Sequence, residues 1–429
     1  MTTDKQKNIA ALDRQRHIYI NGMAGLRPVV PFDFQSLEAA ARQRLSKEGF
    51  AYIAGGAGLE STMQANTRAF DRWQIVPRML RDVSNRDISI KLFGQSLPTP
   101  LLTCPIGVLE MAHPEADLGV AKATAGLGIP MIFSNQASVP MEDCAAVMGQ
   151  SPRWFQLYWS KSNELVQSLV SRAEQCGCTA VVVTLDTTML GWRTRDLNLA
   201  YLPFLRGMGI AQYLSDPVFL SMLEQMPPAS AARPKITLTT LRNLITVVNK
   251  YPGRGFFKKL RSGKPMAAVR LFIDIYSRPS LTWEDLSFLR KNTQLPILLK
   301  GILHPEDAQK AVAYGADGII VSNHGGRQVD GAIGAFTALP SVVAATHGQI
   351  PVLLDSGVRT GADVFKALAL GAKAVCIGRP YAYGLAVAGQ AGVAAVLQNL
   401  MADFELTMGL AGCTTIADIT PETLVQSKI

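Results

Sequence analysis

The stretch "VSNHGGRQVDG", residues 321–331, places a histidine beside two glycines and three residues before an arginine. A neutral imidazole is suited to removing a proton near pH 7, and a guanidinium binds a carboxylate through paired hydrogen bonds. His324 is therefore a candidate general base and Arg327 a candidate carboxylate ligand. Taken alone, the stretch fits a polar turn without chemistry equally well.

Other residues with matching chemistry stand at or just after the ends of apolar runs. Asp186 would orient the imidazole of His324 and stabilise its protonated form. Arg193 would complete a carboxylate clamp with Arg327, which indicates an anionic substrate. Lys300 ends an apolar run, a position where a lysine needs an anionic partner. Two tyrosines could add hydroxyl donors, namely Tyr52 and Tyr158.

Two glycine-containing loops, "DSGVRTGAD" and "IGRP", have the composition of phosphate-binding segments. Glycine lets backbone amides approach a phosphate closely, and arginine adds charge-assisted hydrogen bonds. The residues concerned are Gly357, Gly361, Gly378, Arg359 and Arg379. The alternative is that they only build turns. No G-x-G-x-x-G joins a strand to a helix, so we predict a mononucleotide phosphate and not a Rossmann dinucleotide. No metal site is predicted.

Eight short apolar runs alternate with helix-like stretches from about residue 98 onward. Parallel strands buried on both faces have continuous apolar runs of this kind. The runs cover residues 100–107, 130–137, 154–159, 180–187, 296–302, 318–324, 351–357 and 374–380. The periodicity alone also allows a doubly wound sheet. In such an open sheet the site lies at one switch point, but here a polar residue or a glycine lies at or near the end of every run. We therefore predict an α/β fold, a (β/α)8 TIM barrel with its site at the carboxyl ends of the strands.

Two segments lie outside this repeat. Residues 1–97 are predicted to form an N-terminal helical segment that packs on the barrel, and the barrel itself to span residues 98–420. Residues 188–295 separate the fourth and fifth strands and are too long for an ordinary connection. We expect a lid over the active face there, with a basic insertion at about 197–280. Residues 421–429 are assigned to a C-terminal tail.

The amino-acid composition limits the classes of protein to which this chain can belong. Of the 429 residues 48% are hydrophobic, which is enough for a large core. The six cysteines do not have the spacing of a disulfide framework, and the charged start "MTTDKQKNIAALDRQRHIY" is not a signal peptide, so we expect a cytoplasmic location. Residues 380–402 carry no charge but are rich in glycine and alanine, which predicts a buried helix and not a membrane span.

The positive charge belongs to one segment. The formal net charge is +9, and residues 229–270 hold ten Lys or Arg and no Asp or Glu. Since 9 − 10 = −1, the rest of the chain is nearly neutral, and nucleic-acid binding by the body of the protein is not expected.

With these residues assembled, the sequence resembles the FMN-dependent 2-hydroxy-acid oxidising family, which includes glycolate oxidase, lactate oxidase, lactate 2-monooxygenase and mandelate dehydrogenase. The resemblance covers about residues 32–420 and rests on specific motifs. These motifs are "SNHGGRQVDG", "LPILLKGI", "DSGVRTGADVFKALALGA", "IGRPYAYG", "FQLYW" and "TLDT". Within the family, "LGWRTRDLNLAYLPFLRGMGIAQYLSDPVF" is most similar to lactate 2-monooxygenase.

The resemblance implies a role for each matching residue. His324 would take the substrate proton with support from Asp186, and Lys300 would face the flavin N1–C2=O edge. The substrate carboxylate would be held by Arg193, Arg327, Tyr52 and Tyr158. The flavin ring would contact Pro105, Ile106, Gly107, Ser134, Gln156 and Thr184, with Ser322 a further cofactor contact. The ribityl phosphate would be held by Asp355, Ser356, Gly357, Arg359, Gly378 and Arg379.

The implied reaction oxidises a small L-2-hydroxy acid, such as lactate, to the 2-keto acid. Two electrons pass to FMN, which O2 or another acceptor reoxidises, and a homotetramer is implied as well. Gly107 stands where many relatives have alanine and lactate 2-monooxygenase has glycine. The extra space could retain keto acid and peroxide for oxidative decarboxylation, or the exchange could be neutral. Gln136 stands where glycolate oxidase has tryptophan, so a glycolate preference is not implied.

The basic insertion leaves a further alternative open. Membrane-bound relatives use this region to reach lipid, and each cation near an anionic bilayer contributes ~1 kcal/mol. A membrane-peripheral, quinone-linked dehydrogenase is therefore the alternative, beside a solvated lid or one packed in an oligomer. An inactive FMN-binding protein is disfavoured because all the expected site residues are present. The final Ser427-Lys428-Ile429 is close to a peroxisomal tripeptide.

Overall fold

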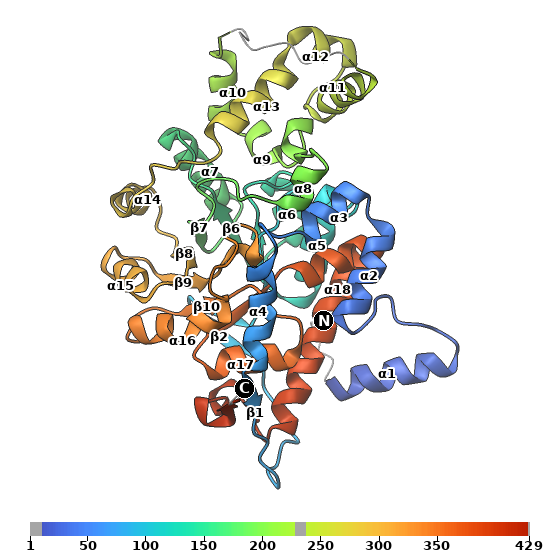
Figure 1. Cartoon of the computed structure of the whole chain (residues 1–429), viewed down its shortest axis with the longest axis vertical. Helices are drawn as coiled ribbons and strands as arrows, with labels where there is room; N and C mark the ends of the chain where they lie inside the picture. Colours follow the sequence, from blue (N-terminus) through green and yellow to red (C-terminus); the bar gives the residue numbers. More distant parts are fainter. Residues whose placement is uncertain (1–10, 228–236, 428–429) are drawn as a thin grey trace, which may run out of the picture.

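Eight parallel strands close into a barrel in a computed structural model that describes residues 11–227 and 237–427 (Figure 1). In chain order they are β4 (Leu101–Thr103), β5 (Met131–Phe133), β6 (Arg153–Leu157), β7 (Val181–Thr184), β8 (Ile297–Ile302), β9 (Gly318–Val321), β10 (Val352–Leu354) and β11 (Ala374–Ile377). Strand β11 closes the barrel on β4, with Cys376 opposite Leu102. Every strand overlaps one of the eight predicted runs, and the predicted (β/α)8 barrel is confirmed.

Apolar side chains fill the barrel interior. They are at most 1% exposed and include Leu102, Ile132, Trp154, Val182, Leu298, Ile320 and Leu353. A hairpin of β2 (Ile90–Leu92) and β3 (Gln95–Leu97) adds two leucines to this cluster. Phe93, at the hairpin turn, lies edge-on to Trp154 with ring centroids 5.7 Å apart. The hairpin thus closes the amino-terminal end of the barrel, and the opposite end is left for a site.

Helices cover the outside of the barrel. They are α5 (Ala116–Leu127), α6 (Met141–Met148), α7 (Asn163–Gln175), α14 (Leu286–Asn292), α15 (Pro305–Ala313), α16 (Ala335–Ala345), α17 (Gly361–Ala369) and α18 (Arg379–Leu410). Local sequence fixes several starts: the side chain of Ser162 caps α7, and Thr360 forms a capping box with Asp363 at α17. Among the described residues, α18 alone is long and apolar enough to cross a membrane, and here it packs against α5 and α17.

The segment before the barrel positions part of the site. It contains α1 (Ala11–Met23), α2 (Phe34–Arg44), α3 (Lys47–Ala54), α4 (Ser61–Asp71) and β1 (Trp73–Ile75). Asn66 of α4 exchanges side-chain hydrogen bonds with Asn323, which directly precedes His324. Strand β1 pairs antiparallel with β12 (Leu424–Gln426), so residues beyond 420 contribute an ordered strand beside the N-terminal segment.

Residues 185–296, called the insertion below, separate β7 from β8. They form α8 (Thr194–Asn198), α9 (Ala211–Leu214), α10 (Pro217–Glu224), α11 (Leu238–Lys250), α12 (Phe256–Ser262) and α13 (Lys264–Ile275) before α14. Figure 1 shows α10–α13 at one end of the molecule. Glu110, after β4, accepts hydrogen bonds from Lys250 Nζ and from the Gly209 amide, which attaches the insertion to the barrel. Two of the ten predicted cations, Arg233 and Lys235, lie outside the described residues, as do Lys428 and Ile429.

Candidate active site

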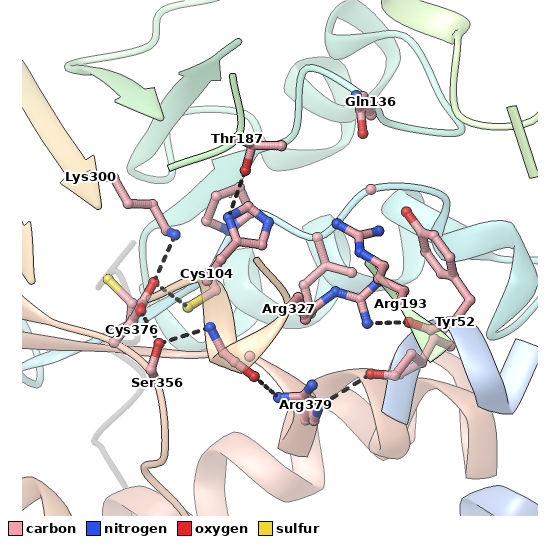
Figure 2. A pocket seen from close by; sticks show the side chains of 18 of the residues that line it. Tyr52, Cys104, Gln136, Thr187, Arg193, Lys300, Arg327, Ser356, Cys376 and Arg379 are labelled. Carbon is pink, nitrogen blue, oxygen red and sulfur yellow. Dashed lines mark hydrogen bonds and ion pairs between the residues drawn. The ribbon is translucent and has the colours of Figure 1, made fainter. Parts of the chain in front are cut away.

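A pocket at the carboxyl ends of the strands gathers most of the predicted site residues (Figure 2). The space between its lining residues, counted out to the open solvent at its mouth, is about 1010 Å³. Its lining includes Tyr52, Pro105, Ile106, Gly107, Tyr158, Arg193, Lys300, His324, Arg327, Asp355, Ser356, Gly357, Arg359, Gly378 and Arg379. The remaining predicted residues, Ser134, Gln156, Thr184, Asp186, Ser322 and Gly361, are not part of the lining, and the Gly361 amide instead donates to the carboxylate of Asp403. The others stand behind the lining.

His324 opens the short 3₁₀ helix η4 (His324–Gly326), which begins after a two-residue connection from the end of β9. Its φ of +57° is unusual for a residue with a side chain, and such strain gathers at functional sites. Its Nδ1 lies 2.7 Å from Oδ1 of Asp186. The carboxylate holds the proton on Nδ1, so the second nitrogen, Nε2, is free to accept a proton. Nε2 lies 3.5 Å from the hydroxyl of Tyr158, which also lines the pocket.

Electrostatics keep this imidazole neutral. Burial lowers the pKa of His324 below its usual value, and Lys300 lowers it further, while Asp186 opposes both. Burial alone would raise the pKa of Asp186, but Lys300 and His324 bring it down to about 2. Asp186 is therefore charged and His324 uncharged near neutral pH. This is the protonation state that a general base paired with a stabilising carboxylate requires.

Lys300 lies between two carboxylates at the end of β8. Its Nζ is 3.2 Å from Oδ2 of Asp355 and 3.8 Å from Oδ2 of Asp186, and it donates to Oγ of Ser322 at 2.8 Å. Burial alone would lower the pKa of Lys300, but these two carboxylates hold it above its usual range. The ammonium is a fixed positive charge in the pocket wall, which confirms the expectation of an anionic partner at this position.

Two further cations, Arg193 and Arg327, line the pocket beside Tyr52. Figure 2 shows this group across the pocket from Lys300 and Ser356. Arg327 donates to the carbonyl of Gly55 at 2.8 Å and lies over the ring of Tyr52 at 5.1 Å. Neither guanidinium forms an ion pair within the described ranges, and Nε of Arg193 is buried without a partner. Burial lowers the pKa of Arg327 to about 9, so an anionic ligand would relieve an unfavourable desolvation.

A second pair of cations lies where the loops after β10 and β11 meet. Arg379 donates to the carbonyls of Ile53 at 3.2 Å and Gly325 at 2.9 Å, and Arg359 stacks over Phe34 at 4.0 Å. Nε of Arg359 has no partner among the described residues, and burial lowers the pKa of this guanidinium to about 10. Two buried guanidiniums without a carboxylate, beside Gly357 in a left-handed conformation, fit a phosphate.

Unpaired polar atoms at the carboxyl ends of β6 and β7 mark a third part of the site. Nε2 of Gln156 and Oγ1 of Thr184 are buried without a hydrogen-bond partner in the described residues, although Oε1 of Gln156 accepts from the Asn135 amide at 3.1 Å. Buried donors are normally satisfied, so these atoms fit the polar edge of a planar cofactor ring. Oγ of Ser134 accepts from the Gln136 amide at 3.1 Å, which fixes the hydroxyl while its hydrogen can still be donated.

Several lining residues were not predicted from the sequence. They are Ile53, Cys104, Thr187, Leu190, Phe204, Tyr276, Gly325, Val358 and Cys376, together with Gln136, which had no predicted role. Thr187 donates to Asp186 at 3.1 Å and lies 3.1 Å from Nδ1 of His324. The sequence did contain a signal for Thr187, because this hydroxyl residue directly follows the predicted carboxylate Asp186. Phe204 and Tyr276 come from the insertion, and no spacing in the sequence links them to the strand ends.

The fold and the site together define a barrel enzyme that removes a proton from an anionic substrate beside a phosphate-bearing cofactor. The family model described as FMN-dependent dehydrogenase matches residues 41–426, and the chain belongs to this family. It is 43% identical over 397 residues to an L-lactate oxidase of Lysinibacillus sphaericus, covering 92% of this chain and 93% of that protein. It is 44% identical over 405 residues to an FMN-dependent alpha-hydroxy acid dehydrogenase of Penicillium citrinum, covering 94% and 93%.

Solved structures agree with this assignment. A crystal structure of mandelate oxidase superposes with a TM-score of 0.74 at 35% identity and covers 93% of this chain and 99% of that one. The chain is therefore an FMN-dependent enzyme that oxidises 2-hydroxy acids. The site fits this cofactor: Arg359 and Arg379 would hold the phosphate, and the unpaired atoms of Gln156 and Thr184 would bond the ring.

Proposed function

We propose that the protein oxidises a small, lactate-like L-2-hydroxy acid to the 2-keto acid and passes the electrons to O2. The observation that carries the proposal is the convergence of a neutral His324, oriented by Asp186, with two guanidiniums that form no ion pair with a described residue, all in one pocket. The identity to an L-lactate oxidase supports the substrate class.

Each residue has a defined task in this reaction. Arg193 and Arg327 bind the substrate carboxylate, which fixes the 2-hydroxyl group and the α-carbon within the pocket. Nε2 of His324 takes one proton, and Asp186 stabilises the imidazolium that forms. FMN, when bound, would accept the two electrons and the second proton released as the alcohol becomes a ketone. Transfer of two electrons and two protons to O2 then gives hydrogen peroxide as the second product.

Coupled oxidative decarboxylation, as in lactate 2-monooxygenase, is a second candidate outcome, and Gly107 favours it. A Cβ at this position would meet Cβ and the carbonyl oxygen of Gln136, both at 3.0 Å. The space beside Gly107 is therefore filled by the segment carrying Gln136 and is not the extra room expected from the sequence, but the close packing closes the pocket wall at this point. A closed wall of this kind would help to retain keto acid and peroxide until they react with each other.

Product analysis tests both outcomes. The FMN-loaded protein is supplied with a panel of L-2-hydroxy acids under oxygen, and keto acid, peroxide and carbon dioxide are quantified. Pyruvate and peroxide in equal amounts from lactate support the oxidase and reject the monooxygenase, whereas acetate and carbon dioxide without peroxide do the reverse. If an artificial dye is reduced while little oxygen is consumed, the electron acceptor is a molecule other than O2, as in a quinone-linked dehydrogenase. Unchanged lactate oxidation by FMN-loaded His324→Ala would overturn the assignment of the base.

A further inference from the structure

The side chain of Gln136 ends in an amide that has no partner within the described part of the chain. Gln136 lines the pocket and is only 6% exposed. Its backbone is engaged, because the amide donates to Oγ of Ser134 at 3.1 Å and the carbonyl accepts from the Val108 amide at 2.9 Å. The side-chain atoms Oε1 and Nε2, in contrast, form no hydrogen bond with any residue that the structure describes. A buried amide normally has a partner, so these two atoms indicate a ligand that supplies one.

Gln136 belongs to the wall that the insertion adds to the pocket. A Cβ added to Gly209 of the insertion would lie 3.0 Å from the carbonyl oxygen of Gln136 and 3.2 Å from Cε1 of Phe204. Gln136 and Phe204 are therefore close neighbours. The ring of Phe204 lies 6.3 Å from the ring of Tyr276, whose hydroxyl also has no hydrogen-bond partner among the described residues. One wall of the pocket thus contains an unpaired amide and an unpaired phenol.

This wall faces the part of the substrate that has no contact yet. The carboxylate is assigned to Arg193 and Arg327, and the 2-hydroxyl group to Nε2 of His324. Figure 2 shows Gln136 at the edge of the pocket opposite Arg379, and hence away from the cations assigned to the phosphate. The group on the α-carbon that still lacks a contact is the side chain, which begins at the third carbon. We therefore assign the wall that contains Gln136 to this side chain.

The chemistry of the wall favours a hydroxyl group on the substrate side chain. A hydroxyl can donate to Oε1 of Gln136 or accept from Nε2, whereas the methyl group of lactate can do neither and would leave the amide unpaired. A second carboxylate would need a further cation. The cations of the described lining are already assigned to the first carboxylate, to the phosphate or to the charge network, and they are Arg193, Lys300, Arg327, Arg359 and Arg379.

We propose that Gln136 selects 2-hydroxy acids that carry a hydroxyl group on the third carbon, of which L-glycerate is the smallest. The inference rests on the proposed oxidation of a small L-2-hydroxy acid and names the side chain that the pocket prefers. Lactate differs from glycerate by this one hydroxyl group and is therefore the poorer substrate of the two. A site that hydrogen-bonds a substrate hydroxyl discriminates against the analogue without it, because the polar group of the protein is then left unpaired.

Two substrates of nearly equal shape test the proposal. L-2-hydroxybutyrate carries a methyl group where L-glycerate carries the hydroxyl group. Each acid is mixed with the FMN-loaded protein in the absence of oxygen, and the loss of flavin absorbance gives the rate of reduction at each concentration. We expect the second-order rate constant to be about 10–100-fold higher for glycerate. Gln136→Met removes the amide at nearly constant size and should make the two rate constants about equal.

A control variant and a binding measurement separate recognition from packing. Phe204→Leu changes the shape of the same wall but none of its polar groups, so it should affect both acids alike and leave their ratio unchanged. The keto acids report on binding without turnover. The oxidised, FMN-loaded protein should bind 3-hydroxypyruvate more tightly than 2-oxobutyrate, as measured by the change in flavin absorbance, and Gln136→Met should remove the difference.

The possible outcomes distinguish this inference from the proposed function. Equal reduction of the flavin by both acids, or an unchanged preference in Gln136→Met, would contradict the role of Gln136 and leave the proposed function intact. An equal loss with both acids in Gln136→Met would show that the glutamine serves packing alone. If no 2-hydroxy acid reduced the flavin, the proposed function would fail and this inference with it.

Discussion

At the scale of single residues, His324 is a base because its neighbours act on its pKa in opposite directions. Burial and Lys300 lower that pKa, whereas Asp186 raises it and also fixes the ring through a 2.7 Å hydrogen bond. Lys300 in turn is held between Asp186 and Asp355. The base is therefore one member of a charge network, and changing one neighbour changes its titration.

Replacing Asp186 with asparagine should lower kcat/KM by about 10²–10⁴-fold, because the imidazolium loses its stabilising charge. The acid limb of the pH profile should move to lower pH, since Asp186 is the group that raises the pKa of His324. Steady-state kinetics across pH, at constant FMN content, measure both effects. Thr187→Val is the matched control: it removes a hydroxyl from the same cluster but no charge, so a comparable loss there would contradict this account.

The pH dependence of the unmodified enzyme follows from the same network. The pKa of His324 lies below its ordinary 6.5, and the neutral form is the active one. Activity should therefore rise with pH and reach half of its plateau below pH 6.5 as His324 loses its proton. A profile of kcat/KM against pH checks this, and an acid limb centred above 6.5 would show that another group controls the reaction.

At the scale of elements, the insertion completes the pocket from outside the barrel. Phe204 and Tyr276 line the pocket, and both pack on Phe272 of α13, with ring centroids 5.3 Å and 5.1 Å away. Glu110 connects this unit to the barrel through Lys250 and the Gly209 amide. The position of the aromatic wall therefore depends on a contact far from the reacting groups.

Glu110→Gln should raise KM about fivefold and change kcat less, because an ion pair of this kind contributes about 1 kcal/mol to holding the insertion in place. Gly209→Ala should have a larger effect in the same direction. Its φ is +68°, and an added Cβ would lie 2.5 Å from Cγ2 of Val108. Steady-state kinetics check both variants. Lys264→Gln breaks an ion pair within the insertion itself, with Glu224, and should leave KM unchanged.

At the scale of the whole molecule, the protein folds with buried positive charge that its cofactor and substrate must neutralise. Arg327, Arg359 and Arg379 each have a pKa lowered by burial, and none forms an ion pair with a described residue. Binding of FMN should therefore stabilise the fold markedly, in proportion to RT ln(1 + [FMN]/Kd).

Arg359→Met should weaken the binding of FMN but should not destabilise the cofactor-free protein. FMN affinity should fall about 10–100-fold with the loss of a charge-assisted phosphate contact. The cofactor-free protein should be as stable as before or more so, because a buried cation without an anionic partner is removed. Thermal unfolding with and without FMN, and fluorescence titration with FMN, measure the two effects. A cofactor-free variant much less stable than the unmodified one would show that Arg359 serves mainly to hold the fold.

The barrel could be predicted from sequence because each strand is buried on both faces and therefore appears as an apolar run. The site followed from the barrel, since the carboxyl ends of parallel strands meet at one end and bring His324 close to Asp186. The contributions of Phe204 and Tyr276 could not be predicted, because they depend on how the insertion folds back over the pocket. The pairing of β1 with β12 was equally hidden: each strand has three residues, and nothing local connects Trp73 with Gln426.

That last pairing has a consequence for biosynthesis. A ribosome that adds about 5–20 residues per second needs on the order of tens of seconds to travel from Trp73 to Gln426. During that interval the edge of β1 is unpaired, and β4 likewise lacks its neighbouring strand until β11 has been synthesised. Neither the barrel nor the strand pair that joins its flanking segments can be completed until nearly the whole chain has left the ribosome. The nascent protein should therefore depend on chaperones during its synthesis.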